Sequence, residues 1–284
     1  MYMISISTLS HLTPEQLIPA FNQAFDDYIV PVNLTPLFFR QKVIQENLRL
    51  EFSTGTFDNG RLVGLMLHGI GEMNGEPVAY NGGTGVIPEY RGRHLVGNMY
   101  SFLKPRLETA GIRRLLLEVI DTNERAIRAY RRVGFRELRA LDCFKGEIRG
   151  PALKPGPDYN VTVRPGLPWE ELPSFWNYRP TWQHSLDAAR RGQGFMQYVA
   201  VEEKGQLRAY GIMIPGSGRI VQYGVHPGYR GMGLGRLVFH HFAQLGNPRL
   251  TVLNVSREEE QSQRFLRRIG FVRYLGQYEM EWRT

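Results

Sequence analysis

The chain carries an internal repeat. Residues 86–92 (VIPEYRG) return as residues 225–231 (VHPGYRG), 139 positions later. Two further pairs follow in the same order at an offset of 136: residues 117–119 (LEV) with 253–255 (LNV), and residues 134–135 with 270–271, both Gly-Phe. A repeat of this length and order indicates two copies of one supersecondary arrangement. The 284 residues are therefore expected to form two domains of similar fold.

A proline-rich segment separates the copies. Residues 150–158 (GPALKPGPD) contain three prolines and two glycines. Such a segment continues neither a helix nor a central strand, so it is interpreted as a linker. The predicted domains are residues 1–149 and 159–284.

Both copies show the same order of elements. Strands are expected at 61–70 and 77–86, a helix at 95–110, a strand at 114–119 and a helix at 124–133. The second copy repeats them at 206–214, 219–225, 234–245, 249–255 and 258–269. In each copy Gly-Phe and a last β-rich segment follow. This order predicts an α/β (α+β layered) fold with helices packed on a mixed sheet.

The repeated turn has a specific physical use. In both copies a strand ends in a turn that opens directly into a helix, and in the second copy this turn, residues 230–235, reads RGMGLG. Free backbone N–H groups at a helix N-terminus, with the positive end of the helix dipole, attract a pyrophosphate. Glycines let its oxygens approach the backbone. The turn therefore predicts a phosphate-binding site.

The paired motifs resemble the GNAT N-acetyltransferase superfamily. They read V-x-P-x-Y-R-G-x-G-x-G and, some 25 residues on, L-x-V-x-x-x-N-x-x-A-x-x-x-Y-x-x-x-G-F. The resemblance covers both halves. It implies two GNAT-like domains, each a mixed, mostly antiparallel sheet with helices on both faces. It also implies transfer of an acetyl or other acyl group from acyl-CoA to an amine of a small molecule or peptide, with no metal.

The resemblance implies CoA-binding residues in both copies. The first copy contributes Val86, Arg91, Gly92, Arg93, His94, Leu95, Val96 and Asn123. The second copy contributes Val225, Arg230, Gly231, Met232, Gly233, Leu234 and Gly235.

The copies depart from the motif in opposite ways. In the first, His94 and Val96 replace the later glycines of the loop, but the distal motif is complete and includes Tyr130. In the second, the loop is intact, but Leu266 stands at the tyrosine position.

Acyl transfer needs a donor for the oxyanion and a proton for the departing thiolate. A backbone N–H at Val86 or its neighbour suits the first role. Because leucine cannot donate a proton, we favour the first copy as catalytic, with Tyr130 as general acid.

Other polar residues have weaker support. Glu118 is a candidate general base, or equally a solvated strand carboxylate. Arg125, Arg128, Arg131 and Arg132 crowd one helix and either form a solvated face or meet the CoA 3′-phosphate. Asp26, Asp27 and Tyr28 either attract a cationic amine or form an exposed acidic helix end. His68 and the adjacent pair His240 and His241 are not supported as metal ligands, because neighbouring helical side chains diverge.

Composition excludes several classes. The single cysteine, Cys143, rules out an internal disulfide and favours a buried, inert thiol. No apolar stretch approaches the length of a membrane span, and the N-terminus lacks a secretory signal, so a cytoplasmic protein is expected. The net charge of +8 suits an anionic ligand.

Three alternatives to this assignment stay open. In the first alternative the chain is an acyl-CoA-binding regulatory protein without catalytic activity. In the second, catalysis takes place in the C-terminal copy. Nucleic-acid binding is the weakest, because the arginines are scattered and no aromatic-basic platform accompanies them.

Overall fold

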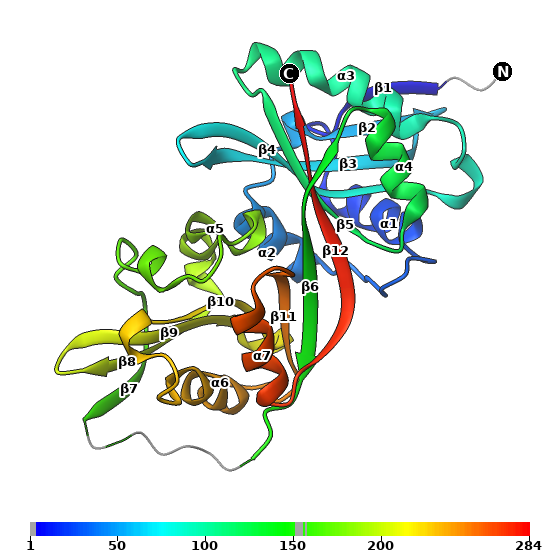
Figure 1. The fold of residues 1–284 in the computed structure, drawn as a ribbon. Coiled ribbons are helices and arrows are strands. Elements are labelled where there is room, and N and C mark those ends of the chain that lie inside the picture. Colours follow the sequence, from blue (N-terminus) through cyan, green and yellow to red (C-terminus); the bar gives the residue numbers. More distant parts are fainter. Residues whose placement is uncertain (1–3, 151–155, 157) are drawn as a thin grey trace. The chain divides into compact units, whose positions relative to one another are not determined.

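The computed structural model describes residues 4–150, 156 and 158–284. They form two compact units, each built on β-strands and helices (Figure 1). The first unit comprises Met1–Leu138 together with Tyr278–Thr284, and the second comprises Arg139–Gln277. Most of the expected linker, residues 151–155 and 157, lies outside the described residues.

The first unit places helices on both faces of a mixed sheet. Its strand order is β1-β2-β3-β4-β5-β12, with β1 to β4 antiparallel and β4–β5 parallel. Its elements are β1 (Ile4–Thr8), α1 (Pro14–Ala24), α2 (Pro36–Glu46), β2 (Thr54–Asp58), β3 (Arg61–Met73), β4 (Glu76–Val86), α3 (Leu95–Thr109), β5 (Arg114–Ile120), α4 (Glu124–Arg132) and the end of β12 (Val272–Arg283).

The second unit repeats this arrangement. Its strand order is β6-β11-β10-β9-β8-β7, and β10–β11 is again a parallel pair. Its elements are most of β6 (Arg136–Gly146), β7 (Tyr159–Arg164), η3 (Leu172–Phe175), η4 (Trp182–His184), α5 (Leu186–Arg191), β8 (Gln197–Glu203), β9 (Gln206–Ile214), β10 (Arg219–Val225), α6 (Leu234–Gln244), β11 (Leu250–Ser256) and α7 (Glu260–Arg268). The expected α/β (α+β layered) fold, with a mixed sheet and helices on both faces in each unit, is confirmed.

The last strand of each repeat belongs to the other unit. Most of β6, from the first repeat, pairs with β11, while the end of β12, from the second, lies beside β5. The compact units therefore divide at 138/139 and 277/278, and they differ from the expected ranges 1–149 and 159–284. Local sequence does not predict this exchange, because a β-rich segment can pair with the edge strand of either unit.

Each sheet has an apolar cluster on both faces. In the first unit α1 and α2 cover one face, with Phe21 and Phe39 in the cluster, and α3 and α4 cover the other, with Leu103 and Ile127. Glycine is required in β4 because α1 packs directly on its backbone. A Cβ added at Gly85 would lie 2.7 Å from the Ala24 side chain. Among the described helices, none is long and apolar enough to cross a membrane.

Candidate active site

The first unit has a cavity where two parallel strands part. β4 and β5 pair only from Ala79 with Leu115 to Asn81 with Leu117. Beyond this point, a cavity of about 410 Å³ lies against the end of β4, where Thr84 and Val86 line it. The other walls come from the turn before α3, from α4 and from the segment that follows α1.

The turn before α3 offers backbone donors to this cavity. Gly92 and His94 adopt left-handed conformations, with φ of 79° and 57°. His94 is the N-cap of α3 and provides no side-chain cap, so the first N–H groups of the helix remain available to a ligand. The loop thus keeps the geometry that a pyrophosphate needs, although two motif glycines are replaced.

Arg91 lines the cavity, but other parts of the unit hold its guanidinium. Nε donates to the Val86 carbonyl at 2.8 Å, and one Nη donates to the Ala24 carbonyl at 3.0 Å. Both terminal nitrogens reach the Asp27 carboxylate, at 2.5 and 2.6 Å. This contact with Arg91 lowers the pKa of Asp27. Arg91 therefore ties the segment after α1 to β4, and its predicted role in phosphate binding is untested.

Tyr130 lies in the cavity wall on α4. Its side chain is buried, with its ring packed edge-on against Phe135 and Tyr100. Burial raises the pKa of Tyr130 to about 12, while a hydrogen bond with Thr84 opposes the shift. The phenol is therefore protonated at neutral pH and able to donate.

A chain of polar contacts continues behind Tyr130. The Asn81 amide nitrogen donates to the Thr84 hydroxyl and to the Tyr100 hydroxyl, each at 2.7 Å. The Asn81 carbonyl oxygen accepts from the Gly83 N–H at 3.0 Å. Asn81 thus fixes the hydroxyl that contacts Tyr130.

Two other residues expected at the site differ in their placement. Glu118 does not line the cavity, and its carboxylate accepts a hydrogen bond from the Tyr80 hydroxyl at 2.5 Å. Asn123 does line it and caps α4 by accepting from the Ala126 N–H at 3.2 Å. Tyr28 also lines it, and a hydrogen bond with Asn123 partly offsets the rise that burial causes in its pKa.

Three of the four arginines on α4 reach the cavity. Arg125, Arg128 and Arg132 line it, whereas Arg131 forms an ion pair with Glu137. Arg128 also pairs with Glu124 at 2.8 Å, and both side chains are exposed. The rim of the cavity is therefore rich in positive charge, as an anionic cosubstrate requires.

The second unit has a larger cavity at the same place. β10 and β11 pair only through Arg219 with Thr251 and Ile220 with Val252. The cavity beyond them measures about 630 Å³ and is lined by the loop residues Arg230, Gly231, Gly233, Leu234 and Gly235. Met232, with a largely exposed side chain, is not part of the lining.

The second loop matches the first in conformation. Gly231 and Gly233 have φ of 84° and 86°, and Gly233 is the N-cap of α6. Arg230 donates to the Val225 and Phe175 carbonyls at 3.2 and 3.3 Å, in parallel with Arg91. Both loops therefore present the same backbone to a ligand.

In the second unit a strand, and not the helix, places a tyrosine in the cavity wall near the motif position. Leu266, at the position of Tyr130, is fully buried in the core. Tyr223 on β10 stands at the position of Thr84, 139 residues on, and lines the cavity. The sequence motif missed it because the motif specifies a helical tyrosine, whereas reading the strand at the same offset reveals the exchange.

The remaining histidines and the cysteine lie outside both cavities, with one exception. His68 is fully buried in β3, and burial lowers its pKa to about 3. His240 contacts Arg236, and His241 contacts the Leu237 carbonyl. Cys143 is a buried thiol outside any disulfide, with Gln277 3.6 Å from its Sγ. The exception is His184 in η4, which lines the second cavity and which no sequence motif marked. Within the described residues, no group of three or more His, Cys, Asp or Glu side chains is placed to hold a metal ion.

Solved structures with the same fold cover nearly the whole chain. A tandem GNAT protein from the clavulanic acid biosynthesis pathway is 14% identical, with a TM-score of 0.71, and the match covers 99% of this chain and 98% of that one. A GCN5-related N-acetyltransferase from Sphaerobacter thermophilus is 13% identical, with a TM-score of 0.70, over 99% and 95%. A putative acetyltransferase from Pyrococcus horikoshii is 14% identical, with a TM-score of 0.67, over 100% and 89%. At these identities the likeness concerns the fold.

Sequence comparison identifies the family. A search of curated protein sequences finds no match to this chain. The model of the acetyltransferase (GNAT) family matches residues 17–135 and again residues 166–271, one match in each repeat. The two matches span most of the chain, which therefore belongs to the GNAT acetyltransferase family, in tandem form.

Proposed function

We propose that this protein transfers an acyl group from acyl-CoA to the amine of a small molecule or peptide, and that Tyr130 of the first unit protonates the departing thiolate. The observation that carries the proposal is the position of the Tyr130 phenol. It lies in the cavity wall, on the helix that faces the turn before α3. Family membership supports acyl transfer in general, and the position of Tyr130 is the basis for assigning to it the protonation of the thiolate.

The proton balance of the step is simple. The neutral amine attacks the thioester carbonyl carbon and a C–N bond forms. The nitrogen, positively charged after the attack, releases one proton to water, and the C–S bond breaks. The thiolate sulfur takes the proton of Tyr130, and solvent returns a proton to the phenolate. Because its pKa is about 12, Tyr130 holds this proton throughout the neutral range. Glu118 lies outside the cavity lining, so we assign it no role as a base, and the acceptor amine binds in its neutral form.

The cavity also suits the anionic part of acyl-CoA. The N-terminus of α3 presents backbone donors, and Arg125, Arg128 and Arg132 line the same cavity. Donors and positive charge thus converge where a pyrophosphate would lie, and the opening between β4 and β5 adjoins them.

Removal of the Tyr130 hydroxyl tests this assignment. Tyr130→Phe should lower kcat by about 10²- to 10⁴-fold, the usual contribution of general acid catalysis, with little change in acyl-CoA affinity. Thiol release from acetyl-CoA in the presence of an amine panel measures the rate, and calorimetry measures binding. Tyr278→Phe is the matched control, because Tyr278 packs against the same cluster but does not line the cavity. Full turnover by Tyr130→Phe would exclude the assignment.

A further inference from the structure

The cavity of the second unit has no negative charge in its wall. Among the described residues that line it, none is a carboxylate, and the charged ones are Arg230, Arg236, Arg264 and Arg268. A positively charged ligand group therefore finds no partner there. At about 630 Å³ the cavity is also larger than the cavity of about 410 Å³ in the first unit, so it accepts a bulkier ligand.

Three buried polar atoms in this wall lack hydrogen-bond partners among the described residues. They are Oδ1 of Asn177, Nε2 of His184 and the hydroxyl oxygen of Tyr223. Across the described part of the first unit, no residue with such an atom lines the cavity. Because buried polar groups in folded proteins are almost always hydrogen-bonded, three exceptions in one cavity indicate groups that a ligand satisfies.

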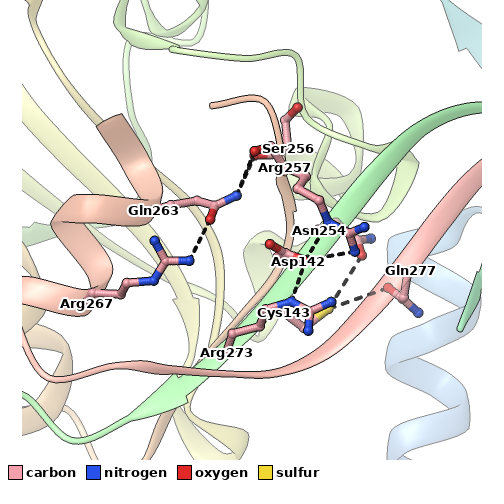
Figure 2. A network of polar contacts seen from close by, with 9 residues as sticks. All are labelled: Asp142, Cys143, Asn254, Ser256, Arg257, Gln263, Arg267, Arg273 and Gln277. Atoms are coloured by element: carbon pink, nitrogen blue, oxygen red, sulfur yellow. Dashed lines mark hydrogen bonds and ion pairs between the residues drawn. The ribbon is translucent and has the colours of Figure 1, made fainter. Parts of the chain in front are cut away.

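Two other amides in the wall already have partners. The Asn254 amide nitrogen donates to the Thr181 hydroxyl at 3.0 Å. Figure 2 shows Asn254 beside Cys143, whose Sγ lies 3.9 Å from the Asn254 carbonyl oxygen. The Gln222 side chain donates to a backbone carbonyl and accepts from the Tyr210 hydroxyl at 3.0 Å. Both amides therefore hold the wall in place and leave ligand binding to the atoms without partners.

Asn177 and Tyr223 share one neighbour, Ser262 of α7. The Asn177 amide nitrogen donates to the Ser262 hydroxyl at 3.2 Å, so its carbonyl oxygen is the group left without a partner. The Tyr223 phenol is buried near the same hydroxyl, and its ring packs against Phe265 with centroids 5.9 Å apart. Burial raises the pKa of Tyr223, so the phenol stays protonated. An acceptor oxygen and a neutral hydroxyl thus lie near one another.

His184 adds no charge to this wall. Its side chain is 4% exposed, and its Nδ1 lies 3.1 Å from the Thr181 hydroxyl. Burial lowers the pKa of the imidazole well below its usual range, so the ring is neutral near pH 7. Its Nε2 donates or accepts according to the tautomer. The groups without partners are therefore all uncharged.

A hydroxyl group is the ligand group that satisfies Asn177 and Tyr223 together. A carbonyl oxygen such as Oδ1 of Asn177 only accepts, so the ligand must donate to it. A ketone or a carboxylate on the ligand cannot donate, and an ammonium group meets only arginines. A hydroxyl donates to Asn177 and accepts from the Tyr223 phenol with the same oxygen atom.

The position of Tyr223 relates this pair to the acyl chain of acyl-CoA. Tyr223 stands at the position of Thr84, which contacts Tyr130, the residue proposed above to act on the thiolate sulfur. By the repeat, a CoA held by the second loop brings its sulfur close to Tyr223, and the third carbon of an acyl chain is near enough to share this wall. Aromatic side chains form the wall beyond, namely Phe175, Trp176 and Tyr178.

We propose that the second unit selects an acyl-CoA whose short acyl chain carries a hydroxyl on its third carbon, and that Asn177 and Tyr223 bind this hydroxyl. This selection rests on the acyl-CoA chemistry proposed above and gives the second unit an acyl group other than acetyl. The hydroxyl donates to Oδ1 of Asn177 and accepts from the phenol of Tyr223. Binding of this kind forms and breaks no covalent bond.

Three thioesters of equal chain length test the selection. Racemic 3-hydroxybutyryl-CoA carries the hydroxyl, acetoacetyl-CoA carries an oxygen that only accepts, and butyryl-CoA carries neither. Calorimetry of the full chain should show one site that binds the hydroxy compound at least about tenfold more tightly than the other two, because these leave buried groups unpaired. Equal affinities for the three thioesters overturn the proposal, and so does acetoacetyl-CoA that binds as tightly as the hydroxy compound.

Two substitutions test the residues assigned to the hydroxyl. Tyr223→Phe should reduce the preference to less than about threefold, while the thermal midpoint without ligand stays unchanged or rises, since the lost hydroxyl has no partner among the described residues. Asn177→Leu should reduce the preference to the same extent. Tyr274→Phe is the matched control, because Tyr274 belongs to the same unit but does not line the cavity. A full preference in Tyr223→Phe or in Asn177→Leu overturns the proposal.

Gly233→Val assigns the preference to a unit, because Gly233 is the N-cap of α6 in the second loop. It should weaken the tight site for the hydroxy compound by about 10- to 100-fold. If that site keeps its affinity, the preference belongs to the first unit and the proposal fails. These titrations contain no amine, so they do not depend on turnover by Tyr130. An absent preference leaves the assignment of Tyr130 standing, and full turnover by Tyr130→Phe leaves a measured preference standing.

Discussion

In the first unit a buried polar chain links Tyr100, Asn81, Thr84 and Tyr130, whereas the second unit has Phe239, Ile220, Tyr223 and Leu266 at these positions. The correspondence follows from the repeat offset and from matching irregularities, at 81–83 in β4 and at 220–222 in β10. Of the tyrosines that line the two cavities, Tyr130 lies on α4 in the first unit and Tyr223 lies on β10 in the second. A phenol can therefore lie beside the cavity even where the motif's tyrosine position on the helix is occupied by another residue.

The loops show compensation of another kind. Val96 and Ala129 both line the cavity of the first unit, and the second unit has Gly235 and Phe265 at these positions. A Cβ at Gly235 would stand 3.1 Å from the Phe265 ring, so each pair fills similar space in a different way. Substitutions that look like losses in the first loop are therefore matched by changes on the facing helix.

The largest effect is expected at Gly233, the left-handed N-cap of α6. A β-branched residue there is strained by roughly 1–3 kcal/mol. Gly233→Val should therefore weaken CoA binding in the second unit by about 10- to 100-fold. Gly233→His should cost less, because His94 adopts this conformation in the first unit. Calorimetry of the full chain should show two CoA sites, of which one weakens. Equal losses with Val and His would contradict the comparison.

Next in size is the pH dependence that His68 imposes on the first unit. Its pKa falls from 6.5 to about 3 in the folded state. Stability is therefore complete above pH 6.5 and is lost as the unfolded chain takes up a proton below it. Between pH 7.5 and 5 the loss from this group is about 2 kcal/mol.

His68→Met tests this contribution with the second unit's own residue. Met213 occupies the corresponding position, since it pairs with Ile220 as His68 pairs with Asn81. The variant should keep its stability at pH 7.5, because both imidazole nitrogens lack partners among the described residues. Urea denaturation at the two pH values should show a smaller loss than in the parent chain. An unchanged pH dependence would mean that His68 is hydrated in solution.

A smaller effect should appear in a double-mutant cycle across the loop of the second unit. Gly235→Val should destabilise it by roughly 1–3 kcal/mol through overpacking against Phe265. Phe265→Ala should also destabilise, by loss of packing in the core. The double variant recreates the Val96 and Ala129 pair, and we expect a favourable coupling energy of about 1 kcal/mol in denaturant titrations. Strict additivity of the two single changes would show that the pairs do not compensate.

Much of the fold follows from local signals. The expected strands and helices agree with the structure within three residues at each end, because each copy places turn residues and apolar periodicity together. The loop geometry also follows, since Gly92 and Gly231 take the left-handed conformation that such a turn requires. The exchange of β6 and β12 does not follow, because strand pairing across distant segments leaves no local mark.

The candidate sites depended more on tertiary contacts. Arg91 fits the motif of a phosphate ligand, yet Asp27, 64 residues earlier, holds its guanidinium. His184 lies in a short 3₁₀ turn without a motif, and only folding brings it beside Thr181 and Asn254. Tyr223 can be aligned with Thr84 by the repeat offset. Its place beside the cavity became clear only from the structure, because the motif specifies a tyrosine on a helix.

The smallest effect is expected for His94→Gly, which gives the first loop the residue of the second. A left-handed conformation costs an L-residue roughly 1–2 kcal/mol, and less for histidine than for most. Glycine removes this strain but adds conformational freedom to the unfolded chain, worth about 0.4–1 kcal/mol in the opposite direction. The two terms nearly cancel, so the unfolding free energy should change by less than about 0.5 kcal/mol.

If the His94 side chain merely fills the turn, CoA affinity in the first unit should change less than about twofold in His94→Gly. Calorimetry at pH 6 and pH 8 distinguishes the other case, because an imidazole that contacts phosphate binds more tightly when protonated. A loss of affinity that is larger at pH 6 would make His94 a ligand and remove the equivalence of the two loops.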